Sequence, residues 1–163
     1  MSSEKIQVAV CMGSDSDWPV MCAATKILTD LGISCKPLVL SAHRMPLEMA
    51  EFAQSARANG FDVIIAGAGG AAHLPGMIAS LTTLPVIGVP VSATKLDGMD
   101  SLLSIVQMPA GIPVATVGID NAHNAGLLAA RILGMTDSAI AQKLENYARE
   151  INTQAAAKQA NLT

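Results

Sequence analysis

No Asp, Glu, Lys or Arg occurs between Val63 and Thr94, and this charge-free stretch leaves two kinds of fold to consider. A run of that length could be a membrane span. Glycines and prolines, however, divide it into short apolar segments, VIIA and PVIGVPV, separated by a glycine-rich loop. Irregular backbone is not tolerated against lipid, whereas short apolar runs are typical of parallel strands covered on both faces. We therefore predict buried parallel strands and no membrane contact.

Apolar runs alternate with helical patterns along the whole chain. Strands are expected at about 7–12, 34–40, 62–66, 86–89 and 114–119. Helices are expected at about 18–31 and 46–59, after the glycine loop, up to about 107, up to about 133, and from about 137 to 157. Alternating strands and helices give a parallel sheet with helices on both faces.

This alternation predicts a single α/β domain over residues 1–163. We expect a three-layer α/β/α, flavodoxin-like (Rossmann-like) parallel sheet of about five strands in the order 2-1-3-4-5, with an extra C-terminal helix. Pro37 lacks a backbone N–H, so the second strand is expected at an edge of the sheet.

Composition limits the classes of partner. The net charge is −3 and no run of Lys or Arg occurs, which argues against nucleic-acid binding. Charged residues make up 14% of the chain, below the usual share of about 25%, so part of the surface is expected to contact another subunit. The three cysteines are odd in number and form no Cys-x-x-Cys motif, and the N-terminus has no apolar signal segment. We therefore expect free thiols and a cytoplasmic location.

The strand order predicts where a ligand binds. In such sheets, ligands lie beyond the carboxyl ends of the strands, at the point where the strand order reverses. This rule brings three polar loops into one crevice: GSDSD, SAHR and GAGGAAH.

In GSDSD, Ser14 and Ser16 can donate hydrogen bonds, and Asp17 can accept them from sugar hydroxyls. The loop precedes a helix, whose N-terminus favours an anion or a polar ligand. The alternative, an ordinary helix N-cap, accounts for one of these residues and remains open.

In SAHRMP, His43 can transfer protons near neutral pH, and the adjacent Arg44 offers a fork of donors suited to phosphate. Ser41 lies close by in the same loop. A structural histidine is the alternative, but its place at the predicted crevice favours a functional role.

The glycine loop contains Gly67, Gly69 and Gly70, which allow a ligand to approach the backbone N–H groups closely. As a dinucleotide fingerprint it is weak, because it follows the third strand rather than the first. Close packing of helix on strand is an equal alternative. His73 is expected either to contact a ligand or to cap the helix that starts at Leu74.

Other chemistries find little support. The histidines and cysteines lack the spacing of metal ligands, so no metal site is expected and a pairing of His43 with His73 would be a coincidence of folding. No G-x-S-x-G motif is present. His123, in DNAHNAG, is expected to be an exposed loop residue.

Several of these motifs together resemble one family. The segments VAVCMGSDSDW, SAHRMP, AGAGGAAHLPGM, PVIGVPV, LLSIVQMPAGIPVATV and NAGLLAARIL, between about residues 8 and 133, look like the class I N5-carboxyaminoimidazole ribonucleotide mutases of purine biosynthesis. The resemblance implies an isomerase that moves a carboxylate from the exocyclic nitrogen of its ribonucleotide substrate to ring carbon 4. It also implies that no cofactor or metal is used, and that the chain forms an octamer.

The same resemblance implies roles for individual residues. His43 would be the catalytic proton-transfer residue, Arg44 and Ser41 would hold the 5′-phosphate, and Asp17 would hold the ribose hydroxyls. The migrating carboxyl group would be enclosed by His73 and by the amides of Ala68, Gly69, Gly70 and Ala71. The remaining implied contacts are Gly13, Ser14, Ser16, Ala42 and Leu74. Two alternatives stay open: a flavin- or dinucleotide-binding redox protein, and a nucleotide-binding module without catalysis.

The predicted C-terminal helix, at about 137–157, has one apolar stripe. Ile140, Leu144, Tyr147 and Ile151 follow one another at helical spacing. Because the sheet is already complete before this helix, we expect the stripe to pack on a neighbouring subunit of a homo-oligomer. Packing on its own domain is the alternative.

Overall fold

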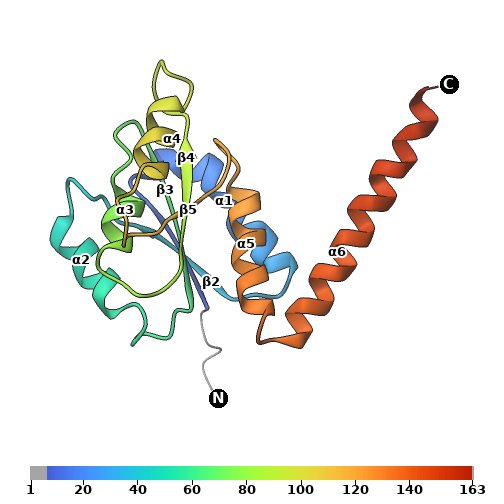
Figure 1. Cartoon of the computed structure of the whole chain (residues 1–163), viewed down its shortest axis with the longest axis horizontal. Helices are drawn as coiled ribbons and strands as arrows, with labels where there is room; N and C mark the ends of the chain where they lie inside the picture. Colours follow the sequence, from blue (N-terminus) through green and yellow to red (C-terminus); the bar gives the residue numbers. More distant parts are fainter. Residues whose placement is uncertain (1–6, 163) are drawn as a thin grey trace.

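Five parallel strands form one sheet in the order β2-β1-β3-β4-β5 in the computed structural model, which describes residues 7–162 (Figure 1). The strands are β1 (Val8–Met12), β2 (Cys35–Val39), β3 (Val63–Gly69), β4 (Val86–Val91) and β5 (Ala115–Thr116). The predicted strand order is confirmed. Pro37 does lie in an edge strand, β2, which pairs with β1 at one end of the strand order.

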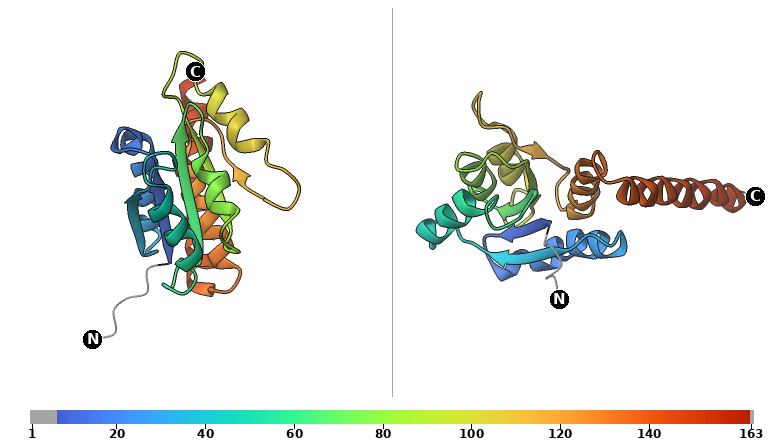
Figure 2. Two further views of the ribbon diagram at one scale, coloured as in Figure 1. Left: turned by 90° about the vertical axis from the view of Figure 1, so that its left-hand side faces the viewer. Right: turned by 90° about the horizontal axis from the view of Figure 1, so that it is seen from below.

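Helices cover both faces of the sheet, as the sequence predicts (Figure 2). One face packs against α1 (Trp18–Asp30) and α5 (Ala122–Gly134). The other packs against α2 (Pro46–Ser55), α3 (Leu74–Ala79) and α4 (Met99–Val106). The short 3₁₀ helix η1 (Asp15–Asp17) links β1 to α1.

The central strands supply both cores, which explains their continuous apolar sequences. In β1, Val8, Val10 and Met12 face the α1 and α5 side, while Ala9 and Cys11 face the other layer. Each of these five side chains is at most 2% exposed. Successive side chains of a strand point to opposite faces, so a strand covered on both faces has no solvent-facing position for a polar residue.

Helices α1 and α5 approach closely because Gly126 has no side chain. A Cβ at this position would lie 2.4 Å from Cγ2 of Ile27 and 3.0 Å from the backbone oxygen of Ala24. Small residues on α5, including Ala122, Ala125, Ala129 and Ala130, continue this buried face.

Some expected boundaries are wrong. β3 continues to Gly69, three residues beyond its predicted end, because Gly67, Ala68 and Gly69 pair with Val89, Pro90 and Val91 of β4. Half of the expected glycine loop is therefore strand. β5 is shorter than expected, with only Ala115 and Thr116 in the ladder.

The last helix, α6 (Ser138–Ala157), leaves the body of the domain at an angle and extends well beyond it, followed by η2 (Lys158–Leu162) (Figure 1). Of its apolar stripe, Ile140 is buried in the core, and Leu144 and Tyr147 pack partly against it. Ile151 is 47% exposed. Three of the four stripe residues thus pack on their own domain, the alternative stated above, while packing of Ile151 on a neighbour stays a prediction. Within residues 7–162, no helix is long and apolar enough to cross a membrane.

Candidate active site

A pocket of about 230 Å³ opens beyond the carboxyl ends of β1 and β3, where the strand order reverses. Its walls come from the end of β3, the start of α3 and the loops after β1, β2, β3 and β4. The lining residues are Gly13, Ser14, Ser16, Asp17, Ser41, Ala42, His43, Arg44, Ala68, Gly69, Ala71, His73, Leu74 and Ala93. Every predicted site residue except Gly70 is among them.

Two residues separate the predicted set from the observed one. Gly70 adopts the left-handed conformation (φ +63°) beside the pocket, and a Cβ there would lie 3.5 Å from Cγ2 of Thr94. Ala93 lines the pocket but was missed, since the sequence reasoning considered only the loops after the first three strands. Its position two residues after the end of β4, the neighbour of β3, is the signal that could have identified it.

The loop after β1 is both a helix cap and a pocket wall. The Ser14 hydroxyl accepts a hydrogen bond from the Ser16 backbone N–H at 3.3 Å. Oδ2 of Asp17 accepts one from the Ser14 backbone N–H at 3.1 Å. The N-cap alternative is therefore correct for Ser14, but the same turn also brings Asp17 into the pocket lining.

Asp17 is a buried carboxyl group, only 6% exposed. Burial raises its pKa, an effect that hydrogen bonds from the backbone of Ser14 and Gly13 and the positive charge of Arg44 partly offset. The carboxylate form of Asp17 thus lacks full solvation in the free chain. A ligand that donates hydrogen bonds, such as a ribose diol, would supply it.

Arg44 is held between two loops. Its Nε donates to the Ser41 hydroxyl at 3.2 Å and its Nη2 donates to the Gly13 carbonyl at 3.1 Å. The Arg44 backbone N–H also donates to Ser41 Oγ, at 3.3 Å. Because Ser41 is buried and its oxygen accepts these hydrogen bonds, it fixes the orientation of the guanidinium. Its own hydroxyl hydrogen stays available for an anion in the pocket.

The two histidines of the pocket contact each other directly. Nε2 of His43 lies 2.6 Å from Nδ1 of His73, and the rings meet edge to face at 83°. A contact this short requires one nitrogen to carry the hydrogen and the other to present its lone pair. The pairing regarded above as a coincidence is thus a central feature of the site, and it provides a path for a proton.

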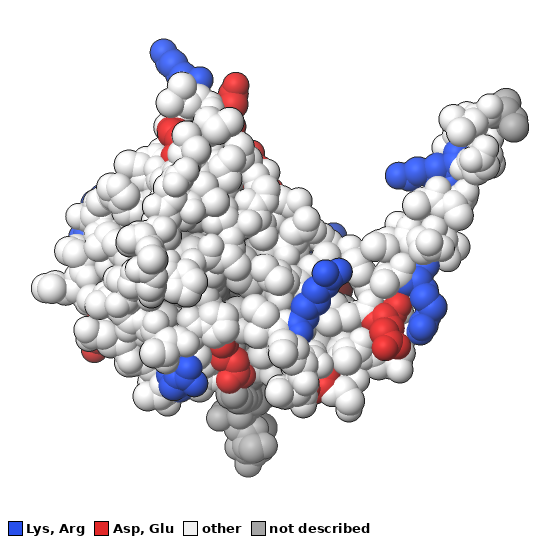
Figure 3. All heavy atoms as spheres, in the orientation of Figure 1, with Lys and Arg blue, Asp and Glu red and all other residues white. Residues whose placement is uncertain are grey.

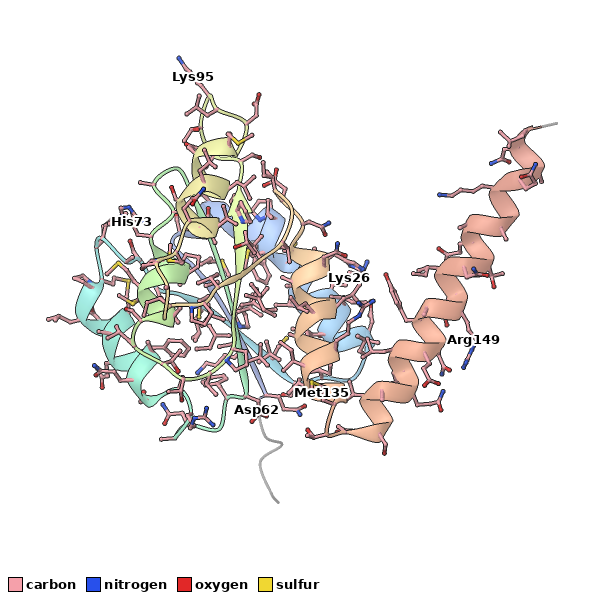
Figure 4. The ribbon with its side chains drawn as sticks, viewed as in Figure 1. Lys26, Asp62, His73, Lys95, Met135 and Arg149 are labelled. Atoms are coloured by element: carbon pink, nitrogen blue, oxygen red, sulfur yellow. The ribbon has the colours of Figure 1, made fainter. Side chains whose placement is uncertain are left out.

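His73 reaches this contact from the start of α3, at the end of the glycine loop (Figure 4). His73 occupies the N-cap position of α3, one of the two alternatives stated for it, but its side chain makes no capping hydrogen bond to the helix. The glycine loop itself is tightly packed. A Cβ on Gly69 would lie 2.5 Å from the Cβ of Ala93 and 3.1 Å from the backbone oxygen of Val91, so the packing alternative holds there as well.

His123 lies outside the pocket, and its expected loop position is wrong. It belongs to the first turn of α5, is half-buried, and places Nε2 3.0 Å from the Tyr147 hydroxyl of α6. Helix α6 covers it, which the local sequence could not indicate. Among residues 7–162, no group of three or more His, Cys, Asp or Glu side chains is arranged to hold a metal ion.

Comparison with known proteins identifies the family. The sequence model of the family described as AIR carboxylase matches residues 7–154. The chain belongs to this family. Among its relatives, the N5-carboxyaminoimidazole ribonucleotide mutase of Pyrococcus horikoshii is 59% identical over 151 residues, covering 93% of this chain and 85% of the relative. The protein of the same name from Thermotoga maritima is 60% identical over 141 residues, covering 86% and 82%.

A solved structure agrees in fold. PurE of Treponema denticola superposes with a TM-score of 0.87 at 26% identity, covering 96% of this chain and 98% of that one. The resemblance found in the sequence motifs is thereby confirmed, as is the α/β sheet.

The buried carboxyl group leads to a first prediction. Because the pKa of Asp17 is raised in the folded protein, its ionisation lowers the free energy of unfolding. This loss is complete above the folded-state pKa and absent below the ordinary pKa of about 3.9. Asp17→Asn should therefore unfold at a higher temperature than the parent at pH 7, and the difference should shrink toward pH 4. Thermal unfolding at the two pH values measures this. Asp15→Asn, at an exposed carboxylate of the same turn, controls for the lost charge, and a difference independent of pH would contradict the assignment.

Proposed function

We propose that this chain is an N5-carboxyaminoimidazole ribonucleotide mutase, an isomerase of purine biosynthesis. It would move the carboxylate from the exocyclic nitrogen of its substrate to ring carbon 4, giving 4-carboxy-5-aminoimidazole ribonucleotide. The observation that carries the proposal is one pocket that unites a histidine pair, a tethered arginine and a buried aspartate, in a chain 59% identical to a mutase of that name. Fold alone would not suffice, because related sheets bind many ligands.

The ribose phosphate half of the substrate fits the polar end of the pocket. Arg44 would bind the 5′-phosphate through the guanidinium edge that Ser41 and Gly13 leave free, and Ser41 would donate its hydroxyl hydrogen. Asp17 would accept hydrogen bonds from the ribose hydroxyls, with Gly13, Ser14 and Ser16 alongside. Ala42 and Leu74 add apolar walls.

The carboxyl group of the substrate would lie between the glycine loop and the histidine pair. The bond between nitrogen and the carboxyl carbon breaks, its electron pair stays on nitrogen, and His43 supplies the proton that nitrogen takes up. Ring carbon 4 then attacks the released carbon dioxide, and its proton returns to His43. Protons and electrons balance, so the reaction needs no oxidant and no cofactor.

His73 would support this cycle through the 2.6 Å contact with His43. It can fix the orientation of the His43 ring and accept or return the shared hydrogen. The amides of residues 68–71 would surround the carbon dioxide. Water must be excluded at this stage, because free carbon dioxide would otherwise be lost.

A turnover assay on the purified chain tests the proposal. The carboxyaminoimidazole substrate should be converted without added bicarbonate, and chelators should leave the rate unchanged. A requirement for bicarbonate together with aminoimidazole ribonucleotide would indicate a carboxylase instead. Visible cofactor absorbance would favour the redox alternative, and binding without turnover would favour the non-catalytic module.

We also propose that the protein works in the cytoplasm. Cys11, Cys22 and Cys35 are free thiols, with Cys11 buried and the other two partly exposed. Accessible unpaired thiols persist in a reducing compartment.

We further propose a symmetric homo-oligomer, most simply an octamer. Several large apolar side chains are exposed on the single chain: Leu96, Met99, Leu103 and Val106 on and before α4, and Ile151 on α6. In the view of Figure 3, few charged side chains lie across the body of the domain. Apolar, charge-poor surfaces of this kind are typical of subunit interfaces.

The projecting half of α6 offers a direct test of assembly. Ile151→Asp places a charge on the apolar stripe beyond the part that packs on its own domain, and should lower the molecular mass measured by light scattering. Asn152→Asp adds the same charge to an exposed neighbour of the same helix and should leave the mass unchanged. Equal masses for both variants would show that this part of α6 does not contribute to the interface.

A further inference from the structure

Asp120 ties together two loops that are distant in the sequence. It lies between β5 and α5, and its carboxylate accepts a hydrogen bond from the Ser92 backbone N–H at 2.8 Å and a second, short one from the Ser92 hydroxyl. The Asp120 backbone N–H donates to the Pro90 carbonyl at 2.8 Å. Asp120 is one of two non-glycine residues with positive φ (+57°) within residues 7–162. Its backbone is thus held in an unusual conformation while its side chain holds Ser92.

Ser92 directly precedes the pocket wall that the sequence reasoning missed. Ala93 lines the pocket and packs on the glycine loop, where the position of a Gly69 Cβ would lie 2.5 Å from its own Cβ. The segment before Ser92 is fixed by β4, and the one after it forms an exposed loop with Lys95 at its tip (Figure 4). Displacing Ser92 would therefore displace Ala93 from the glycine loop.

Both ends of the same loop are also held by contacts from α4. The single hydroxyl hydrogen of the buried Ser101 is shared between the carbonyls of Val91 and Gly98, at 3.0 and 2.9 Å from Oγ. The Thr94 hydroxyl donates to Asp100 at 2.7 Å. These contacts come from α4, whereas Asp120 holds Ser92 from the loop between β5 and α5.

We propose that Asp120 is a positioning residue that keeps Ala93 packed against the glycine loop. In this way it closes the end of the pocket where the migrating carboxyl group would lie. This inference rests on the proposed function, because it concerns the fate of the carbon dioxide. This closure decides between two outcomes after the nitrogen–carboxyl bond breaks. In one, ring carbon 4 attacks carbon dioxide and loses its proton. In the other, carbon dioxide escapes, nitrogen keeps the proton taken from His43, and carbon 4 keeps its own. The products are then aminoimidazole ribonucleotide and carbon dioxide, and His43 regains a proton from water.

The positive φ makes a clean experiment possible. Asp120→Gly removes the carboxylate and leaves a backbone conformation that glycine adopts without strain. Asp120→Asn keeps an oxygen acceptor for the Ser92 N–H, offers an amide to its hydroxyl, and tolerates the same φ. Asp97→Gly is the matched control: it is the same substitution at the other positive-φ aspartate (φ +51°), in the exposed part of the loop.

We expect Asp120→Gly to raise the yield of aminoimidazole ribonucleotide per molecule of 4-carboxy product by roughly tenfold. The kcat should fall while KM changes little, because misplacing a pocket wall by about 1 Å can lower the rate by up to 10²-fold. Asp120→Asn should restore most of the parent ratio, and Asp97→Gly should match the parent. A parent-like product ratio in Asp120→Gly would overturn the proposal, as would an equal change in Asp97→Gly.

Hydrogen exchange of the free protein separates this inference from the proposed function. The Ser92 amide should exchange faster in Asp120→Gly than in the parent or in Asp97→Gly, whether or not the chain turns over the substrate. Unchanged exchange would show that Asp120 does not hold the segment. Faster exchange with no turnover by the parent would count against the mutase assignment and leave the positioning contact intact.

Discussion

Replacing His43 by Asn is expected to lower kcat by roughly 10²- to 10⁴-fold while substrate binding is largely retained. Asn preserves much of the side-chain volume and a hydrogen bond toward His73, whose Nδ1 lies 2.6 Å from Nε2 of His43 in the parent. It cannot deliver a proton to the departing nitrogen or take one from ring carbon 4. Both halves of the proposed reaction should therefore fail together. Steady-state kinetics and direct binding measurements check the two parts of this expectation.

Two further histidine variants calibrate that result. His123→Asn makes the same change outside the pocket, where the ring contacts Tyr147, and should leave kcat near the parent value. His73→Asn should have an intermediate effect, because it removes the partner of the shared hydrogen but leaves the acid itself. If His43→Asn kept about a tenth of the parent activity, a different group would have to move the proton.

The fold was largely predictable because burial on both faces of a parallel sheet leaves a strong pattern. Strands with no polar position, such as β1 and β4, stand out in the sequence, and Pro37 indicated the edge strand. Strand ends were less predictable. β3 runs into the glycine loop because β4 offers it hydrogen-bonding partners up to Val91, a tertiary fact that local sequence does not contain.

The position of the pocket followed from one topological rule, whereas some of the predicted contact residues, such as Ala42 and Leu74, came from the family resemblance. Knowing that ligands bind where the strand order reverses was enough to bring GSDSD, SAHR and the glycine loop together. The contacts within the site were not predictable. The 2.6 Å approach of His43 to His73 and the tether from Asp120 to Ser92 both join loops about thirty residues apart, and side-chain orientation sets them. For the same reason, the packing of α6 over His123 was missed.

The loss of Arg44 is expected to have the second large effect, on substrate binding. A charge-assisted contact to phosphate stabilises a complex enough that Arg44→Ala should raise KM by roughly 10- to 100-fold. The guanidinium is already oriented by Ser41 and Gly13, so little side-chain freedom is lost when the phosphate binds. Initial rates over a range of substrate concentrations measure the change. Arg57→Ala, which removes an exposed arginine bonded to Thr83, is the matched control and should leave KM unchanged.

A substrate without the 5′-phosphate identifies the group that Arg44 binds. If Arg44 binds the phosphate, the parent enzyme should use this nucleoside poorly, and Arg44→Ala should use it about as poorly as the parent, because the missing contact is the same in both cases. The penalties of removing the arginine and removing the phosphate should thus fail to add. If Arg44→Ala instead loses the same factor against both substrates, Arg44 supports the pocket in another way, for example by holding the Gly13 loop, and the phosphate must bind elsewhere.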